Sequence, residues 1–355
     1  MRVALVGPPL SGKSTLFAAV AEAGGSRVDV SRPDHPHLAV VPVPDDRLDW
    51  LAALYNRERI VHAQLEFLDL PGLDLRDEAS RARARTHWAA MRQSDMIVLV
   101  VRGFDSSSMP AYRDRKDPVA DVQELLSEML FADLDQVINR IKKLTASLKK
   151  PTHRHEEEDR ELHLMQRLCE TLESERPISE AVQSQAEAKL IRSFAFLSQK
   201  PLLVVLNGSE SDPARAPEEL AGLACIGLSA KIEEEIAQLP AEDRGEFLAD
   251  LSLESAARDR LIHACYRQMN LMSFLTVGEG ECRAWTLSAG TDAVTAAGEI
   301  HSDIARGFIR AETVAYRDLR NAGDMKSARA GGKVRLEGKS YIVQDGDVIN
   351  FRFNV

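Results

Sequence analysis

The sequence predicts an α/β fold in which a doubly wound parallel sheet carries an inserted antiparallel helical hairpin and is followed by a smaller α+β domain. The first observation is an apolar run, Val3–Val6, that leads through residues 7–14 into a helix-like stretch. The second is a pair of later runs, 96–101 and 201–206, that are apolar throughout, as parallel strands buried on both faces are. The third is the change to short β-like pieces after Leu271.

Residues 7–14 read GPPLSGKS and match the GxxxxGKS pattern of a phosphate-binding loop between a strand and a helix. Such a loop turns its backbone N–H groups onto a polyphosphate, and the helix N-terminus adds positive potential. We expect Lys13 to neutralise the β- and γ-phosphates and the transition-state charge. The sequence therefore predicts a P-loop NTPase (G-domain-like) sheet. The predicted phosphate-binding residues are Gly7, Pro8, Pro9, Leu10, Ser11, Gly12, Lys13, Ser14, Thr15 and Gly72.

A magnesium site is predicted where a second strand ends. The run Gln64–Leu68 delivers Asp69 and then Gly72, in the order DLPG. A carboxylate at the end of a buried strand orders Mg²⁺ water in P-loop enzymes, so we expect Ser14 and Asp69 to serve the Mg²⁺ ion. The proline-rich loop before the strand offers only the Ser31 hydroxyl and no threonine. We therefore expect the metal to be held less completely than in switch GTPases.

The base-binding pocket is predicted at the same edge of the sheet. The strand 201–206 ends in Asn207-Gly208-Ser209-Glu210, and the strand 225–228 ends in Ser229-Ala230-Lys231. Because ligands bind at the carboxyl edge of a doubly wound sheet, these polar clusters should assemble one pocket. The predicted base-binding residues are Asn207, Glu210, Ser229, Ala230 and Lys231.

A helical hairpin interrupts the nucleotide-binding domain. Residues 121–148 carry apolar side chains at coiled-coil spacing, at positions 130, 134, 137, 141, 144 and 148. After a turn, residues 156–175 and 179–197 return as helix. The domains expected are therefore 1–120 with 198–270 for nucleotide, 121–197 for the hairpin and 271–355 at the C-terminus. The hairpin tip is basic, through Lys142, Lys143, Lys149, Lys150, His153, Arg154 and His155. Contact with phosphates and simple solvation of this tip are both open.

Composition excludes several classes of protein. The net charge of −10 argues against a general nucleic-acid coat protein, and no DNA specificity is indicated. No apolar run approaches the roughly 18 residues of a membrane span, and no signal segment precedes the first strand, so we expect a cytoplasmic protein without membrane association. The four cysteines form no CxxC pair, so neither a zinc site nor a disulfide framework is indicated.

With these motifs in hand, the chain resembles the Obg-like ATPases, the YchF subfamily of translation-factor-related P-loop NTPases, nearly from end to end. The most specific matches are VVPVPDDRLD (40–49), LSAKIEEEIAQL (228–239), RAW (283–285), GFIRAE (307–312) and LEGKSYIVQDGDVINFRFNV (336–355). The resemblance implies that residues 271–355 form a TGS domain, a β-grasp module associated with RNA or ribosome contact. It also implies the ribosome or ribosomal RNA as partner, through the hairpin tip and the TGS domain.

The resemblance also bears on the base and on hydrolysis. GTPases use NKxD, whose aspartate accepts from two guanine donors that adenine lacks, whereas this chain has Asn207 and Glu210 in an NxxE order. Members with NxxE favour ATP, so ATP is expected, with GTP kept open. Family members usually carry Asn, associated with potassium, where this chain has Leu10. Leu73 stands where many GTPases place the water-positioning Gln, and the family's catalytic His falls on Ala111.

We therefore expect nucleotide binding with slow or absent turnover, and no catalytic residue beyond Lys13 is assigned. Two alternatives stay open at this stage. One is a nucleotide-binding regulator or scaffold that does not hydrolyse its ligand, and the other is a GTPase that acts as a ribosome-associated factor.

Overall fold

The computed structural model describes residues 1–23, 25, 28–30, 32, 34–107, 109–149, 155–211, 215–240, 242–251, 253 and 255–354. Ser31 of the predicted metal-side loop and Lys150, His153 and Arg154 of the hairpin tip lie outside these residues. The chain forms two compact units, one of residues 1–39 with 66–258 and one of residues 40–65 with 259–355. Among the described residues, no helix combines the length and apolar character needed to cross a bilayer.

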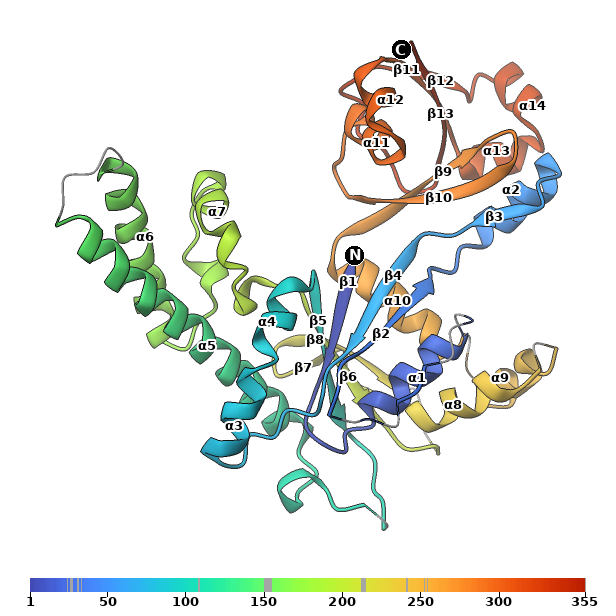
Figure 1. Ribbon diagram of the computed structural model, residues 1–355. Helices are drawn as coiled ribbons and strands as arrows, with labels where there is room; N and C mark the ends of the chain where they lie inside the picture. Colours follow the sequence, from blue (N-terminus) through green and yellow to red (C-terminus); the bar gives the residue numbers. More distant parts are fainter. Residues whose placement is uncertain are drawn as a thin grey trace. The chain divides into compact units, whose positions relative to one another are not determined.

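The first unit contains a seven-stranded sheet of order β2-β4-β1-β5-β6-β8-β7 (Figure 1). Its neighbours from β4 through β8 are parallel, and β7 is antiparallel to β8. The strands are β1 (Arg2–Val6), β2 (His37–Pro42), β4 (Gln64–Asp69), β5 (Met96–Arg102), β6 (Leu202–Asn207), β7 (Glu219–Leu220) and β8 (Leu223–Leu228). The predicted α/β sheet is thus confirmed, and its parallel strands bring their carboxyl ends to one edge.

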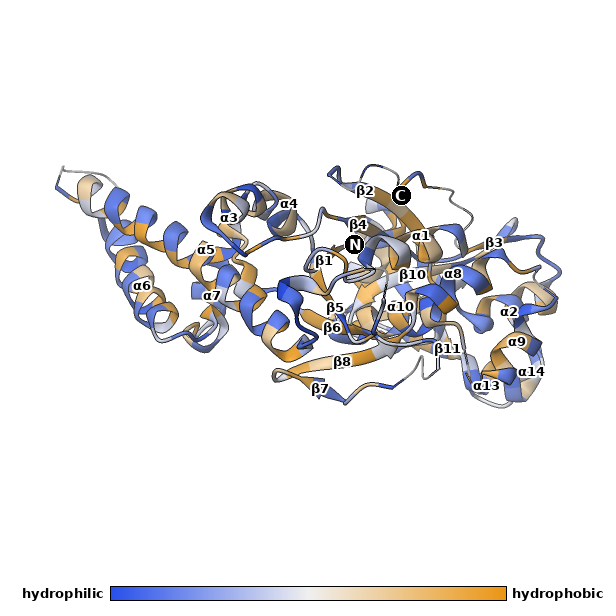
Figure 2. Ribbon diagram, turned by 90° about the horizontal axis from the view of Figure 1, so that it is seen from below, coloured by the Kyte–Doolittle hydropathy of each residue, from blue (hydrophilic) through white to orange (hydrophobic). Residues whose placement is uncertain are grey.

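Helices connect the strands of this sheet. The central strand β5 is buried at every position, as a strand between two helical layers must be (the orange centre of Figure 2). Three of these helices are α1 (Lys13–Ala23), α3 (Glu78–Arg85) and α4 (Trp88–Gln93). After the last strand of the sheet come α8 (Ala230–Gln238) and α9 (Arg244–Asp250), and then α10 (Ala257–Gln268), whose residues from 259 on group with the second unit. The start of α8 is capped by Ser229, whose hydroxyl accepts from the Ile232 N–H.

The predicted helical hairpin is present as α5 (Pro118–Ser147) and α6 (His155–Glu173), which run side by side in both views (Figures 1 and 2). The predicted seam is confirmed, because Val137 and Leu144 of α5 are buried in one cluster with Leu164 and Leu168 of α6. Asp117 caps α5 by accepting from the Ala120 N–H. A continuous hydrophobic seam thus holds the two helices together.

The prediction of one helix over residues 179–197 is wrong. The chain instead forms a 3-10 turn (Ile178–Glu180), a short helix α7 (Gln185–Ile191) and two further 3-10 turns (Arg192–Phe194 and Leu197–Gln199). Ser184 starts α7 as its N-cap, and Ala195 adopts a left-handed φ of 49°, which stops helical continuation. The aromatic side chains of this segment instead complete the hairpin core.

The second unit contains a six-stranded sheet of order β12-β11-β13-β9-β10-β3. Its strands are β3 (Arg59–Val61), β9 (Leu271–Val277), β10 (Glu281–Ser288), β11 (Phe308–Ala315), β12 (Arg335–Glu337) and β13 (Asp347–Phe353). Its helices are α2 (Asp46–Tyr55), α11 (Ala293–Ile300), α12 (Ser302–Arg306), α13 (Tyr316–Ala322) and α14 (Met325–Ala330). Buried Phe274, Phe308 and Phe351 centre the core. This is the α+β C-terminal fold that the sequence predicts.

Residues 40–65 group with the second unit. The sequence predicts instead that they belong to the nucleotide-binding domain. The reason lies in contacts between distant segments. Arg47 of α2 pairs with Asp345 at 2.7 Å, and the rings of Trp50 and Tyr316 meet edge to face with centroids 5.4 Å apart. Strand β3 also pairs with β10 in the same sheet. The predicted division at residues 120, 197 and 270 itself stays a prediction.

Candidate functional site

A cavity of about 770 Å³ lies at the carboxyl edge of the first unit's sheet. Its size is within the range of small-molecule sites, roughly 300–1,000 Å³. Every predicted phosphate-binding residue except Gly7 lines it, and so do all five predicted base-binding residues. Further lining residues, which the sequence did not single out, come from the segment after β5 and from α8. They are Phe104, Asp105, Ser106, Met109 and Glu234.

The loop between β1 and α1 takes its shape from two glycines. A Cβ atom on Gly7 would lie 2.2 Å from the Val100 carbonyl oxygen, and one on Gly12 would lie 2.0 Å from the Asn207 side-chain nitrogen. Gly12 also has a φ of 83°, in the left-handed region that favours glycine. Leu10 occupies the same region with a φ of 62° and is 48% exposed at the cavity. The loop thus presents its backbone to the cavity.

Three side chains predicted to act on phosphate and metal converge beneath this loop. The Lys13 ammonium donates to Asp69 Oδ1 and to the Leu70 carbonyl oxygen, and the Ser14 hydroxyl donates to Asp69 Oδ2 at 2.8 Å. Lys13 and Asp69 are 5% and 2% exposed. Burial lowers the pKa of Lys13, and its ion pair with Asp69 opposes that shift. The strand ends of β1 and β4, which are neighbours in the sheet, bring these groups together.

The Asn207 side chain is hydrogen-bonded to two loops that line the cavity. Its side-chain N–H donates to the Ser11 carbonyl oxygen at 2.9 Å, and its side-chain oxygen accepts from the Ala230 N–H at 2.9 Å. The residue is 3% exposed. A base-binding residue predicted from sequence therefore also ties the phosphate loop to the loop after β8.

The end of the cavity that holds the predicted base-binding residues Glu210 and Lys231, which we call the base end, is more exposed than the end at Lys13, which we call the phosphate end. The Lys231 ammonium donates to Glu210 Oε1 at 2.7 Å, and the two side chains are 61% and 54% exposed. The pair raises the pKa of Lys231, with the hydrogen bond to Glu210 as the main cause. The acid predicted to meet the base therefore has a cation from the neighbouring loop beside it.

Leu73 does not face the cavity. Its side chain is 1% exposed and packs in the core of the sheet, and its N–H donates to the Gly7 carbonyl oxygen at 2.9 Å. Ala111 precedes a 3-10 turn, Tyr112–Asp114. At neither position does this chain carry a side chain that could polarise water.

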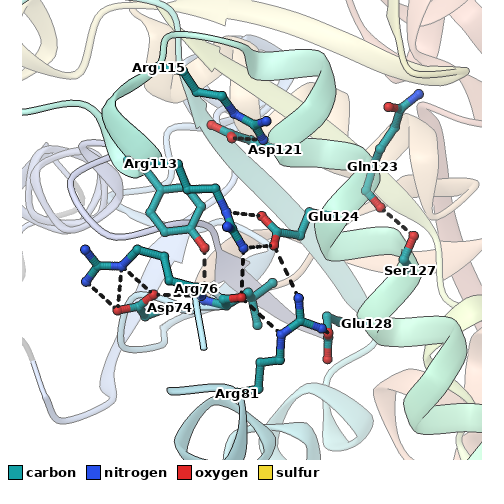
Figure 3. Close-up of polar contacts among 12 residues, drawn as sticks. Asp74, Arg76, Arg81, Arg113, Arg115, Asp121, Gln123, Glu124, Ser127 and Glu128 are labelled. Atoms are coloured by element: carbon teal, nitrogen blue, oxygen red, sulfur yellow. Dashed lines mark hydrogen bonds and ion pairs between the residues drawn. The ribbon is translucent and has the colours of Figure 1, made fainter. Parts of the chain in front are cut away.

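A polar cluster, which we call the Leu75 clamp, holds the segment that follows Gly72 (Figure 3). Its members are Leu75, Arg81, Tyr112, Arg113, Glu124 and Glu128. The Leu75 N–H donates to the Tyr112 hydroxyl at 2.9 Å, and the Leu75 carbonyl oxygen accepts from Arg113 at 2.8 Å and from Arg81 at 3.0 Å. The segment is therefore fixed through its backbone.

The clamp continues to α5. Arg113 donates to both carboxylate oxygens of Glu124, and Arg81 pairs with Glu128 (Figure 3). Arg113 holds a left-handed φ of 54°. Sequence reasoning missed this cluster, because its members come from three separate segments and no local pattern joins them.

The hairpin tip lies away from the cavity residues. Of its seven basic residues, the structure describes Lys142, Lys143, Lys149 and His155, and all four are exposed. None of these four lines the cavity.

Comparisons with known proteins decide the family. A model described as "50S ribosome-binding GTPase" matches residues 2–143, and the YchF-GTPase_C model, described as "Protein of unknown function (DUF933)", matches residues 271–354. The Ribosome-binding ATPase YchF of Bacillus subtilis is 39% identical over 363 residues, covering 99% of this chain and 98% of that protein. The chain belongs to the YchF family.

Other relatives agree over the same length. Obg-like ATPase 1 of Oryza sativa subsp. japonica is 31% identical over 376 residues, covering 100% of this chain and 92% of that protein. The solved structure of the Schizosaccharomyces pombe YchF GTPase superposes with a TM-score of 0.85 at 28% identity, covering 99% of this chain and 97% of that one. The P-loop nucleotide-binding fold with a YchF C-terminal domain is therefore shown for the whole chain.

Proposed function

We propose that this protein is a Mg²⁺-dependent P-loop NTPase that favours ATP over GTP and hydrolyses it slowly. The observation that carries this proposal is that Lys13 and Ser14 line one end of a nucleotide-sized cavity and that both donate to the buried carboxylate of Asp69. A triphosphate in the cavity would draw the Lys13 ammonium from Asp69 to its β- and γ-phosphates.

The residues present fit a magnesium ion. Ser14 Oγ and Asp69 Oδ2 lie 2.8 Å apart and are hard oxygen donors, the type that Mg²⁺ prefers. Mg²⁺ would supply charge neutralisation between the phosphate oxygens. The Lys13 ammonium donates to the other carboxylate oxygen, Oδ1, and so leaves Oδ2 to the ion.

The preference for ATP is inferred from the base end. Guanine recognition by an acid uses a carboxylate that accepts from two donors, and at Glu210 the Lys231 ammonium competes for one of the two carboxylate oxygens. Relatives named as ATPases support the same choice. The fission yeast relative is named a GTPase, and for this reason we keep a GTPase ribosome-associated factor as the second candidate.

Slow hydrolysis is inferred from Leu73 and Ala111. One side chain is apolar and buried, and the other is a methyl group, so neither can orient an attacking water. If hydrolysis is absent, the protein is a regulator or scaffold that only binds nucleotide. A single-turnover measurement separates slow hydrolysis from binding alone, because phosphate release no faster than in buffer without protein would leave only the binding role.

Calorimetry with ATP and GTP, each with Mg²⁺ or with EDTA, tests the ligand. We expect ATP to bind about tenfold more tightly than GTP, and removal of Mg²⁺ to weaken ATP binding by about tenfold, each equal to about 1.4 kcal/mol. Clear preference for GTP would favour the GTPase candidate. No heat with either nucleotide would contradict the whole proposal.

The proposed partner is the ribosome or ribosomal RNA, contacted through the hairpin tip and a C-terminal TGS domain, in a cytoplasmic protein. Homologues named as ribosome-binding support the partner, and the exposed Lys142, Lys143 and Lys149 support the tip. Charge reversal at Lys142 and Lys143 should weaken co-sedimentation with ribosomes. The same reversal at exposed Lys189 and Arg192 serves as the matched control.

We further propose that nucleotide state reaches the hairpin through the Leu75 clamp. Gly72 lines the cavity, Leu75 follows three residues later, and Arg113 links Leu75 to Glu124 on α5. In Glu124→Gln, ribosome binding should become equal in ATP and in ADP. The control Glu78→Gln alters an exposed ion pair with Arg85 outside the clamp. Unchanged dependence on nucleotide in Glu124→Gln would remove the clamp from this role.

A further inference from the structure

His37 carries a largely buried imidazole that no motif accounts for. It is the first residue of β2 and shares the inward face of that strand with Ala39 and Val41, which are buried. Its side chain is 12% exposed. Its Nδ1 atom is buried and has no hydrogen-bond partner among the residues that the structure describes. Burying a polar atom without a partner lowers the stability of the fold, so an unpaired buried nitrogen indicates a partner such as a bound ion.

The Nδ1 atom faces the predicted metal site. It lies 3.9 Å from Asp69 Oδ2, the same oxygen that accepts from the Ser14 hydroxyl. The other carboxylate oxygen of Asp69, Oδ1, accepts from the Lys13 ammonium. One oxygen of Asp69 thus has a lysine beside it, and the other has a hydroxyl and an imidazole.

The 3.9 Å separation is too long for a hydrogen bond. Metal–ligand bonds of about 2.0–2.2 Å place two neighbouring ligands of one ion roughly 3–3.6 Å apart, so a movement of less than about 1 Å would bring both atoms onto one cation. The Phe17 ring is tilted by 38° to the imidazole, with the two ring centroids 6.3 Å apart. The imidazole therefore has an aromatic ring and a carboxylate as neighbours.

We propose that His37 is a nitrogen ligand of the metal ion proposed at Ser14 and Asp69, so that Mn²⁺ can serve this site in place of Mg²⁺ and is bound more tightly there. Imidazole nitrogen binds first-row transition ions better than it binds Mg²⁺, which prefers oxygen. The loop that would normally add a threonine oxygen to this metal has no threonine. The proposal rests on the nucleotide and metal binding proposed above and specifies the third protein ligand.

Electron paramagnetic resonance tests the contact directly. The protein, grown with ¹⁵N-labelled histidine, is loaded with Mn²⁺ and a non-hydrolysable ATP analogue. We expect a ¹⁵N hyperfine coupling to Mn²⁺ that is absent from His37→Asn and retained in His163→Asn, which changes an exposed histidine on α6. The labelled unmutated protein answers the question even if the variant folds poorly.

Calorimetry provides the second readout, with each nucleotide saturated by its metal ion. We expect the Mn²⁺ complex to bind the unmutated protein about tenfold more tightly than the Mg²⁺ complex, a difference that His37→Asn removes while changing Mg²⁺ binding less than about twofold. Nucleotide binding with no ¹⁵N coupling and an unchanged metal preference in His37→Asn would overturn the role of His37 and leave the proposed function intact. No effect of either metal on nucleotide binding would overturn both.

Discussion

The two ends of the cavity are built differently. At the phosphate end, Lys13 and Asp69 are almost fully buried and bonded to each other. At the base end, Glu210 and Lys231 form an ion pair that is more than half exposed. Buried, interlocked groups keep their geometry without ligand, whereas an exposed ion pair is weak and rearranges at low cost. From this comparison we expect nucleotide affinity to be decided at the phosphate end, and base preference, by a smaller energy, at the base end.

The largest expected effect is at Lys13. Lys13→Met keeps the length of the side chain but removes the charge that meets the phosphates, so the Kd of Mg-ATP should rise about 100-fold or more, equal to about 2.7 kcal/mol. Titration calorimetry measures it. Lys189→Met, on the surface of α7, is the control and should leave the Kd unchanged. An increase in the Kd of Mg-ATP of less than tenfold would show that the phosphate end does not determine nucleotide affinity.

Asn207→Ala tests the connection between the ends. The variant leaves the Ser11 carbonyl and the Ala230 N–H unpaired in a buried place, so urea denaturation should show a free energy of unfolding lower by about 2–3 kcal/mol. ATP and GTP affinities should fall by the same factor. Exposed Asn321→Ala is the control. Loss of base preference without loss of stability would instead make Asn207 a base contact alone.

Glu210→Asp tests the base end by itself. The shorter acid loses reach to Lys231 and resembles the acid that GTPases use, so the ratio of GTP to ATP affinity should rise about fivefold, less than 1.4 kcal/mol. Competition binding with both nucleotides measures the ratio. Glu234→Asp, which also lines the cavity, should leave it unchanged. An equal response of the two variants would argue for general charge rather than base contact.

The smallest effect is expected at Leu10. Its left-handed backbone is unfavourable for leucine and tolerated by asparagine, so Leu10→Asn should raise the free energy of unfolding by about 0.5–1 kcal/mol. Chemical denaturation measures the gain. Leu190→Asn, at an exposed helical position, should give no gain. A loss of stability in Leu10→Asn would mean that the leucine side chain contributes contacts that outweigh its strain.

Much of the site could be predicted because its signals are local. The order of strand, glycine loop and helix around Lys13 is set by neighbouring residues, and so is Asp69 at the end of β4. The seam of α5 follows from spacing within one helix. The break at Ala195 could not be predicted, because packing against the hairpin core outweighs the helical propensity of residues 179–197.

The sequence by itself determined that a strand–loop–helix unit presents Lys13 and Ser14, because backbone freedom and residue spacing act within a few residues. The DLPG order also predicted that Asp69 serves one metal ion with Ser14, and the structure shows the two side chains in contact. Only the tertiary structure decided that His37 faces the same carboxylate and that Arg113 reaches Leu75 and Glu124. These contacts join segments that are distant in the sequence, and the order of the strands in the sheet brings the segments together. That order depends on burying the apolar faces of the sheet under helices, which no short stretch of sequence specifies.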